Sequence, residues 1–206
     1  MKIAIIGAGN VGQALAGGWR KAGHDIVFGV RSPAGRKAEL AALGDVAGIR
    51  DAAARAETIV IAVPWTGIGE LTAEIASVAV GKVVIDVTNP IAPPYADLAV
   101  AGSDSGAEQV ARKLKQSRVV KAFNTVGAEV MADPRYPDGP AVLPVAGDDP
   151  GAKATALALA RDLGFEPVDA GPLSMARYLE PFAMLWIKLA LVQGLGRRFA
   201  FRLLQR

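Results

Sequence analysis

The segment that most constrains the fold is the N-terminal run KIAIIGAGNVG, in which an apolar strand leads directly into three spaced glycines. Gly7, Gly9 and Gly12 have the spacing G-x-G-x-x-G, and a helical pattern follows them. In such a unit the first glycine permits a tight turn, the second lets the backbone approach a pyrophosphate, and the third lets helix and strand pack closely. The phosphates then lie on the free N–H groups of the helix N-terminus. We therefore predict a dinucleotide site here and favour it over an ordinary glycine-rich turn.

The rest of the chain alternates short β-branched runs with alanine-rich helical patterns. Strands are predicted over residues 2–6, 25–30, 58–63, 82–87, 119–123, 141–145 and 165–169, and helices over 11–22, 36–43, 68–80, 107–115 and 150–163. The runs IAII and TIVIAV are apolar without alternation, which is typical of strands buried on both faces. Together these patterns predict an α/β fold with a Rossmann-type, doubly wound and mainly parallel sheet.

Two segments interrupt this alternation and suggest a domain boundary between residues 126 and 140. Residues 131–140 are dense in proline, aspartate and glycine and are predicted to form a loop. From Ser174 to the end, apolar residues cover most of the circumference of a predicted long helix, so that helix must be buried on several sides. We expect a nucleotide-binding domain over 1–128 and a small C-terminal α/β-plus-helix domain over 129–206.

Composition excludes several kinds of site. The chain has 206 residues, no cysteine and a single histidine, His24, which argues against a disulfide, a thiolate nucleophile, a metal site and a Ser-His triad. The net charge is only +3, so no nucleic-acid partner is expected. There is no signal-peptide pattern and no apolar stretch of membrane-spanning length. We expect a cytoplasmic protein without a membrane span.

The tip of the predicted strand 25–30 indicates which dinucleotide is bound. NAD-binding folds place a carboxylate about 20 residues past the glycine turn, on the ribose 2′-OH. Here the tip carries Arg31 and Ser32 instead, with Arg36 or Lys37 close behind. An arginine and a hydroxyl suit a 2′-phosphate. The sequence therefore predicts NADP(H) in preference to NAD(H), the alternative being that Arg31 is merely a solvated strand end.

The other strand tips carry amides, hydroxyls and apolar side chains but no evident acid, base or nucleophile. They are Val63-Pro64-Trp65, Thr88-Asn89-Pro90 and Asn124-Thr125-Val126. Trp65 either stacks on a flat ring or shields the sheet edge. Asp86 is expected to be structural, and Lys121 to reach either face of its strand. A redox nucleotide beside such tips suggests direct hydride transfer, in which the protein supplies position and a dry surface.

Several longer segments resemble the NADPH-dependent reductases of the deazaflavin coenzyme F-420, and also the oxidoreductase domain of the six-transmembrane ferric reductases. The resemblance covers nearly the whole chain. It is carried by IIGAGNVG, the VRS strand tip, VPW at 63–65, KVVIDVTNP at 82–90, VVKAFNTVG at 119–127, LPVAGDD at 143–149 and GFEPVDAGPL at 164–173. At residue 124 the deazaflavin reductases carry histidine, whereas the KAFN stretch here is more similar to the ferric reductases.

The resemblance implies a specific set of site residues. Hydride transfer should take place beside Asn124, Thr125 and Val126. The loop 171–174 with Arg177 should form the wall for the acceptor. The cofactor-binding set is expected to be Gly7, Ala8, Gly9, Asn10, Val11, Gly12, Arg31, Ser32, Arg36, Lys37, Val63, Pro64, Trp65, Gly69, Asn89, Pro90 and Ala128.

The resemblance also implies a function and an assembly. The expected activity is hydride transfer between NADP(H) and a deazaflavin or flavin-type second cofactor. The C-terminal domain should close over the nucleotide domain, and the terminal helix should make a homodimer contact. Two other functions stay open: reduction of a small imine or keto substrate, and NADP(H) sensing without turnover. For the basic terminus, a helix cap is favoured over contact of Arg197 or Arg198 with an acidic acceptor tail.

Overall fold

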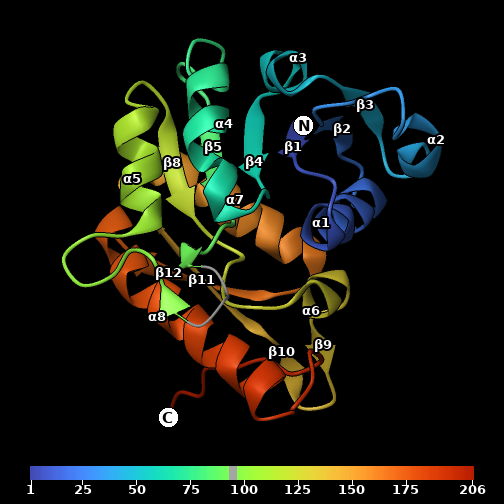
Figure 1. The fold of residues 1–206 in the computed structure, drawn as a ribbon. Helices are drawn as coiled ribbons and strands as arrows, with labels where there is room; N and C mark the ends of the chain where they lie inside the picture. The colour runs from blue at the N-terminus through green and yellow to red at the C-terminus, as the bar shows by residue number, and fades with distance from the viewer. Residues whose placement is uncertain (93–96) are drawn as a thin grey trace.

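The computed structural model describes residues 1–92 and 97–206, and its centre is one eight-stranded sheet (Figure 1). Along the sheet the order is β12-β11-β8-β5-β4-β1-β2-β3, and every neighbouring pair is parallel except β11 with β8. The strands are β1 (Lys2–Ile6), β2 (Asp25–Gly29), β3 (Asp45–Ala47), β4 (Thr58–Ile61), β5 (Val83–Asp86), β8 (Arg118–Lys121), β11 (Val142–Gly147) and β12 (Glu166–Gly171). This confirms the prediction of a doubly wound, mainly parallel sheet.

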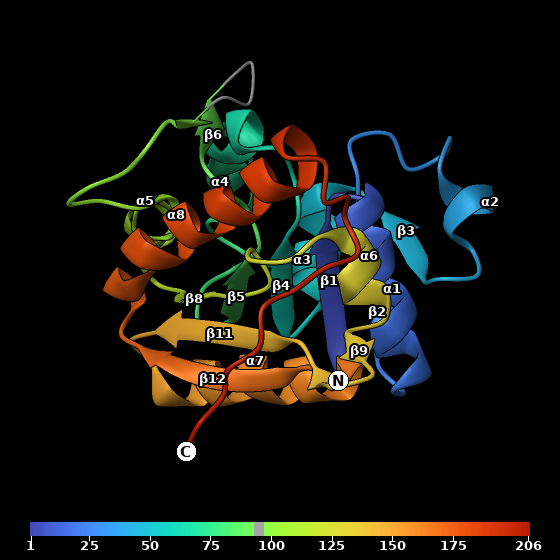
Figure 2. The same cartoon turned by 90° about the horizontal axis from the view of Figure 1, so that it is seen from below.

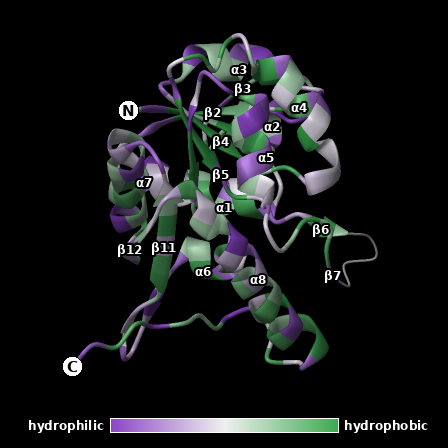
Figure 3. Cartoon of the chain, turned by 90° about the vertical axis from the view of Figure 1, so that its left-hand side faces the viewer, coloured by the Kyte–Doolittle hydropathy of each residue, from purple (hydrophilic) through white to green (hydrophobic). Residues whose placement is uncertain are grey.

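Helices cover both faces of the sheet and bury two separate apolar clusters against it. On one face lie α1 (Asn10–Lys21), α6 (Ala128–Ala132) and α7 (Pro150–Leu163), packed around Trp19 and Phe123. On the other lie α3 (Ile49–Arg55), α4 (Ile68–Ile75) and α5 (Gly106–Lys113). The short α2 (Lys37–Leu40) lies beside β3 at the sheet edge. In Figure 3 the strands are coloured mainly as hydrophobic, whereas the helices carry hydrophilic residues as well.

Local sequence signals set the ends of the helices. At α7 the Asp149 carboxylate accepts a hydrogen bond from the Ala152 N–H at 2.7 Å, and Pro150 occupies the first turn. Gly164 ends this helix with a left-handed φ of 94°. At α5 Ser105 is the N-cap residue, and its hydroxyl accepts from the Glu108 N–H at 3.2 Å and donates to the Glu108 carboxylate at 2.7 Å.

Several short elements were not predicted from the sequence. These are β3, α3, α6, the antiparallel pairs β6 (Ile91–Ala92) with β7 (Asp97–Leu98) and β9 (Arg135–Tyr136) with β10 (Gly139–Pro140), and the 3₁₀ turns η1 (Trp65–Gly67) and η2 (Leu173–Met175). The pair β9–β10 lies within 131–140, which was predicted to be loop throughout. Elements of two to seven residues are too short to show a hydrophobic period, so tertiary contacts decide whether they form.

The prediction of a helix running from Ser174 to the C-terminus is wrong. The helix α8 (Ala176–Ile187) passes into one π-helical turn, η3 (Lys188–Val192), and residues 193–206 are not helical. Gly194 and Gly196 have φ of 76° and 75°, which a right-handed helix cannot contain.

The last residues turn back and pack against the fold, as Figure 2 shows. The Val142 N–H donates to the Phe201 carbonyl at 3.0 Å, and the Trp186 indole N–H donates to the Phe199 carbonyl at 2.9 Å. Phe201 also packs on Phe182, with ring centroids 4.5 Å apart. The apolar residues of this segment are therefore explained by tail packing and not by a helix buried on every side.

One sheet continues across residue 128, the boundary proposed from the sequence. β8 lies in the N-terminal part, and β11 and β12 extend the same sheet beyond it. The division into 1–128 and 129–206 stays a prediction about independent units. Within the described part of the chain, none of the helices combines the length and apolar character needed to cross a bilayer.

Candidate active site

The glycine turn is built as the spacing predicts. Gly7 follows β1 with φ 110°, and a Cβ added there would lie 2.4 Å from the Ala62 carbonyl oxygen. A Cβ on Gly12 would lie 2.1 Å from the Gly7 carbonyl oxygen. At Gly9, by contrast, a Cβ would meet no atom within 4 Å. The first and third glycines are therefore required by the protein's own packing, whereas the second faces open space.

The N-terminus of α1 points its backbone N–H groups at that open space. Gly9 is the N-cap residue, no side chain caps the helix, and its first turn contains no acidic residue. The helix dipole and the free N–H groups together favour a negatively charged ligand.

Three pockets join into one groove along the carboxyl edge of the sheet. One of about 460 Å³ runs from the glycine turn to the tip of β2, and one of about 590 Å³ runs from α1 to the tips of β4 and β5. Both are lined by Gly9, Ala62, Val63 and Pro64. A third, of about 290 Å³, lies beside them between the β2 tip and α4. The glycine turn thus lies where the two larger pockets meet.

The β2 end of this groove carries the basic residues named from the sequence. Arg31 and Ser32 are exposed and line it, and among residues 1–92 and 97–206 neither side chain has a hydrogen-bond or ion-pair partner. Arg36 also lines it, but its guanidinium donates to the Ala8 carbonyl at 2.8 Å and pairs with Glu39 at 2.7 Å. Of the described basic residues that line this end of the groove, Arg31 is therefore the one without a partner. Lys37 is exposed and lines none of the pockets found in the described part of the chain.

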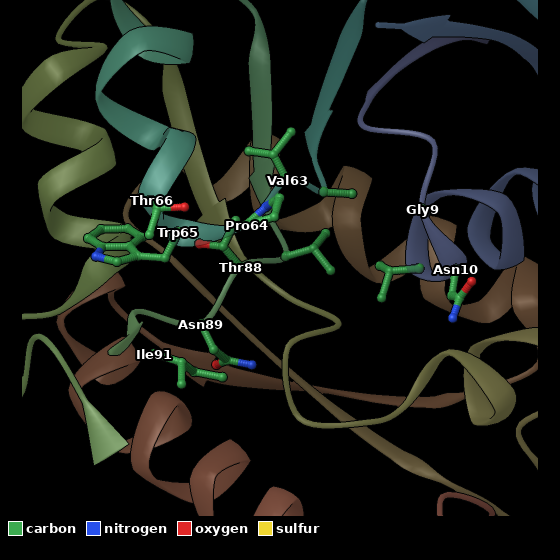
Figure 4. A pocket seen from close by; sticks show the side chains of 12 residues that line it. Gly9, Asn10, Val63, Pro64, Trp65, Thr66, Thr88, Asn89 and Ile91 are labelled. Atoms are coloured by element: carbon green, nitrogen blue, oxygen red, sulfur yellow. The ribbon is translucent and has the colours of Figure 1, made fainter. Parts of the chain in front are cut away.

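The larger pocket lies between the start of α1 and the tips of β4 and β5 (Figure 4). Asn10 lies on one side of it, and Trp65 and Asn89 lie on the other. Its described lining has no titratable side chain and comprises Gly9, Asn10, Val11, Ala62, Val63, Pro64, Trp65, Thr66, Val87, Thr88, Asn89 and Ile91. Such a surface can position a ring and exclude water, but it supplies no proton.

Two asparagines join the tips of β5 and β8. The Asn89 amide donates to the Asn124 carbonyl at 2.9 Å, and the Asn124 amide donates to Asn89 Oδ1 at 3.0 Å and to the Leu179 carbonyl at 3.1 Å. Asn124 is 4% exposed, and its Oδ1 has no partner among the described residues. The preceding residue, Phe123, has φ 63°, an uncommon conformation that cores tolerate only when packing enforces it.

A buried ionic network lies directly behind the lining of the larger pocket. The Lys121 ammonium on β8 pairs with Asp86 on β5 at 2.9 Å and with Glu180 on α8 at 2.9 Å, and all three side chains are at most 1% exposed. Burial by itself lowers the pKa of Lys121, but the two carboxylates outweigh it, so that the pKa is raised. Lys121 also donates to the Thr88 carbonyl. Asp86 and Lys121 are both fully buried, and neither lines any of the pockets described above.

The structure gathers some of the predicted site residues in the groove and leaves others outside it. Gly69 lies beyond Trp65 and lines an adjoining pocket of about 430 Å³, which shares Trp65, Thr66 and Ile91 with the larger pocket. Pro90 is buried beside Gly106, and Ala128 begins α6. Thr125 and Val126 are buried. Like Asn124, neither of them is among the residues that line the pockets described here.

The residues proposed to contact the acceptor have partners elsewhere. Arg177 donates two hydrogen bonds to Glu108, at 2.9 and 2.6 Å. These bonds, together with one from the Ser105 hydroxyl, hold the pKa of Glu108 below its ordinary value. Arg197 lies 3.9 Å from Glu129. Asp148 Oδ1 accepts from the Leu173 N–H at 2.8 Å and fixes the loop that follows β12.

Sequence analysis missed lining residues that have no distinctive motif. The carboxyl-end rule for parallel sheets would have named Ala62 and Val87, because they are among the last residues of predicted strands, and Thr88 was named as a strand tip but not as a cofactor-binding residue. Thr66, Ile91 and Ile49 come from elements too short to predict. Gln13, whose amide donates to the Ala8 carbonyl at 2.9 Å, had no signal in the sequence.

Comparison with known proteins gives a consistent result. The family model "NADP oxidoreductase coenzyme F420-dependent" matches residues 2–90. An F420-dependent NADP reductase of Methanothermobacter thermautotrophicus is 33% identical over 207 residues, covering 92% of this chain and 89% of that protein. The Rattus norvegicus metalloreductase STEAP3 is 32% identical over 180 residues, but this chain spans only 36% of its length. A solved structure from Arthrobacter sp. FB24, described as a candidate F420-dependent NADP reductase, has a TM-score of 0.91 at 32% identity and covers 100% of both chains.

Proposed function

The chain belongs to the family of coenzyme F-420-dependent NADP oxidoreductases, and on that basis we propose that it transfers hydride between NADP(H) and a deazaflavin of the F-420 type. The observation that carries the proposal is the continuous groove. It joins a free helix N-terminus, an unpaired arginine and a pocket whose described lining has no titratable side chain.

Each part of the groove has a distinct task in this proposal. The N–H groups at the start of α1 bind the pyrophosphate, and Gly9 leaves room for its approach. Arg31 and Ser32 bind the 2′-phosphate, because an arginine forks onto phosphate oxygens and a hydroxyl donates to them. Arg36 stays with Glu39 and holds the Ala8 carbonyl.

The larger pocket holds the nicotinamide end. The two cofactors supply the redox chemistry, with a hydride leaving one ring and reaching the other. The protein contributes a wall of Val63, Pro64 and Trp65 on one strand tip and Thr88 and Asn89 on the next. This wall excludes water and fixes the plane of the ring, which is what direct hydride transfer requires of a protein. Asn124 acts through Asn89, since its amide is buried and bonded to that residue.

We further propose that residues 129–206 complete the acceptor side of the groove and provide a homodimer contact. Support comes from large apolar side chains on α8, η3 and the following turn that stay exposed: Tyr178, Leu185, Leu191, Val192 and Leu195, between 49% and 68%. Apolar surface gathered in this way is typical of protein–protein interfaces. Light scattering on the purified protein distinguishes a dimer from a monomer.

The activity is tested by mixing protein, NADPH and one acceptor at a time while absorbance at the NADPH band is followed. Oxidised F-420 should be reduced, with a free flavin as the comparison acceptor. A cyclic imine and a keto acid test the second open function, for which the described pocket lining offers no proton donor. If NADPH binds and no acceptor consumes it, the chain is a nucleotide-binding sensor and the proposal fails.

Nucleotide preference is tested separately with Arg31→Ala. The variant should lose roughly 10- to 100-fold in affinity for NADPH, the worth of one or two charge-assisted hydrogen bonds, while its affinity for NADH is unchanged. Lys37→Ala is the matched control, because this lysine lines none of the pockets among the described residues. Equal losses for NADPH and NADH would contradict the assignment of Arg31.

A further inference from the structure

Three fully buried charges lie directly behind the wall of the larger pocket. Lys121, Asp86 and Glu180 come from β8, β5 and α8, and they are 0%, 0% and 1% exposed. Burying charges is expensive, and a buried ion pair gives little stability over an apolar replacement. A network of three charges in this position therefore calls for an explanation beyond stability.

The network carries more negative than positive charge. Both carboxylates contact only donors: Asp86 accepts from the Thr88 N–H at 2.9 Å and the Thr88 hydroxyl at 2.7 Å, and Glu180 accepts from the N–H groups of Gly106 and Ala107 at 2.8 and 3.1 Å. Two carboxylates and one ammonium leave one unit of negative charge. The N-terminus of α5, which Glu180 caps, offsets about half of it.

The network touches the pocket wall through Thr88. Thr88 lines the pocket, its N–H and hydroxyl bind Asp86, and its carbonyl accepts from Lys121. The next residue, Asn89, also lines the pocket and is drawn in Figure 4 beside Thr88. No side chain among the described lining residues is charged. The buried network is therefore in direct hydrogen-bond contact with a lining residue of this pocket, and its three side chains are closed to solvent, which leaves their charges weakly screened.

We propose that the Asp86–Lys121–Glu180 network sets the preference of this pocket for oxidised over reduced nicotinamide. The inference deepens the proposed function and depends on it. An oxidised nicotinamide ring is a cation and a reduced ring is neutral, so a negative potential at the wall stabilises the oxidised form selectively. By the same difference in binding, it favours departure of the hydride from a bound reduced ring.

The test compares dissociation constants for NADP+ and NADPH in the wild type and in Glu180→Gln and Asp86→Asn, measured by calorimetry. Each variant removes one negative charge from a network that a single residue, Thr88, separates from the pocket. This should raise the ratio Kd(NADP+)/Kd(NADPH) by about three- to tenfold. A residue that only supports the fold would change both constants by the same factor. Affinity for adenosine 2′,5′-bisphosphate, which lacks the nicotinamide, reports such general damage.

Glu108→Gln is the matched control. It also removes a carboxylate from the α5–α8 contact, but Glu108 is paired with Arg177 and lines none of the described pockets. Its ratio should stay within about twofold of the wild type. A change as large as that of Glu180→Gln would show that the effect is not specific to the buried network.

The outcomes separate this inference from the proposed function. If the wild type binds neither nucleotide, the proposed function fails. If both bind and the ratio is the same in the wild type and in both variants, the inference alone fails. If a variant does not fold, the wild type alone still tests the inference. The inference requires the wild type to bind NADP+ at least as tightly as NADPH, and clearly weaker binding of NADP+ would overturn it.

Discussion

Replacing Gly9 by alanine is expected to separate nucleotide binding from folding. The residue has φ −79° and ψ −172°, which alanine adopts freely, and an added Cβ meets no atom within 4 Å. The same methyl group would occupy the space through which a pyrophosphate reaches the backbone N–H groups. The variant should therefore fold like the wild type and bind NADPH poorly.

The magnitudes follow from the structure. Alanine is a poorer N-cap than glycine, at a cost of about 0.5 kcal/mol, and the stiffer unfolded chain returns about the same amount. The melting temperature without ligand should thus move by no more than about 2 °C. NADPH at 100 times the wild-type Kd should stabilise the wild type by about 2.7 kcal/mol, or about 5–11 °C. A tenfold weaker Kd reduces this gain to about 1.4 kcal/mol, and a hundredfold weaker Kd to about 0.4 kcal/mol.

The assay is thermal unfolding with and without NADPH, with Gly12→Ala as the contrasting variant. There the added Cβ would lie 2.1 Å from the Gly7 carbonyl, so the unliganded protein should lose about 1–3 kcal/mol or fail to fold. A Gly9→Ala protein that keeps the full NADPH-induced shift would refute the placement of the pyrophosphate at this turn. So would a Gly12→Ala protein with unchanged stability.

Three further predictions concern stability. Lys121→Met leaves two buried carboxylates without their cation and should cost about 3–5 kcal/mol in urea unfolding at neutral pH, whereas an unchanged midpoint would mean that the carboxylates are not charged in the fold. The Arg177 guanidinium lowers the pKa of Glu108, so their pair stabilises the fold above the carboxyl's ordinary pKa of about 4.5 and this contribution is lost as the pH falls; Glu108→Gln should flatten the acid limb of a pH–stability curve, and parallel curves would contradict this. Phe201→Ala should cost about 1–3 kcal/mol by freeing the tail from Phe182, with faster proteolysis after residue 192 as the readout, and equal cleavage of both proteins would show that the tail is not held there.

The sequence predicts those parts of the site whose geometry is set by residues close together in the chain. Gly7, Gly9 and Gly12 lie within six residues, and their roles follow from one turn whatever the rest of the chain does. Arg31 could be named from the sequence because the end of a parallel strand has a fixed position relative to that turn, and Arg31 does line the groove.

The hydrogen-bond and ion-pair partners of polar side chains were not predictable from the sequence, whether near or far along the chain. Arg36 was grouped with Arg31 as a phosphate ligand; it lines the groove, but its guanidinium is paired with Glu39, three residues further on. Asn124 was predicted to lie beside the reacting rings, which stays a prediction, and the structure adds that it is a buried hydrogen-bond partner of Asn89. In both cases a bond to another side chain fixes the position of the residue. The sequence does not show which of several possible partners that side chain will bind.

The C-terminal segment shows the limit of hydrophobic periodicity. Apolar residues spread around a helix were taken to mean burial on several sides, but Gly194 and Gly196 end the helical geometry and the tail folds back. The two glycines were visible in the sequence. Glycine permits positive φ but does not require it, since Gly17 and Gly18 lie inside α1, so the positive φ at Gly194 and Gly196 became evident only in the structure.

By itself, then, the sequence determined the alternation of strands and helices, the doubly wound sheet and the glycine turn with its basic strand tip. These depend on residue periods and steric needs within a few positions of one another. The tertiary structure alone decided that Asp86, Lys121 and Glu180 meet in one buried network, and that the tail returns to β11. Those contacts join residues dozens of positions apart, and their energies depend on burial, which exists only once the chain has folded.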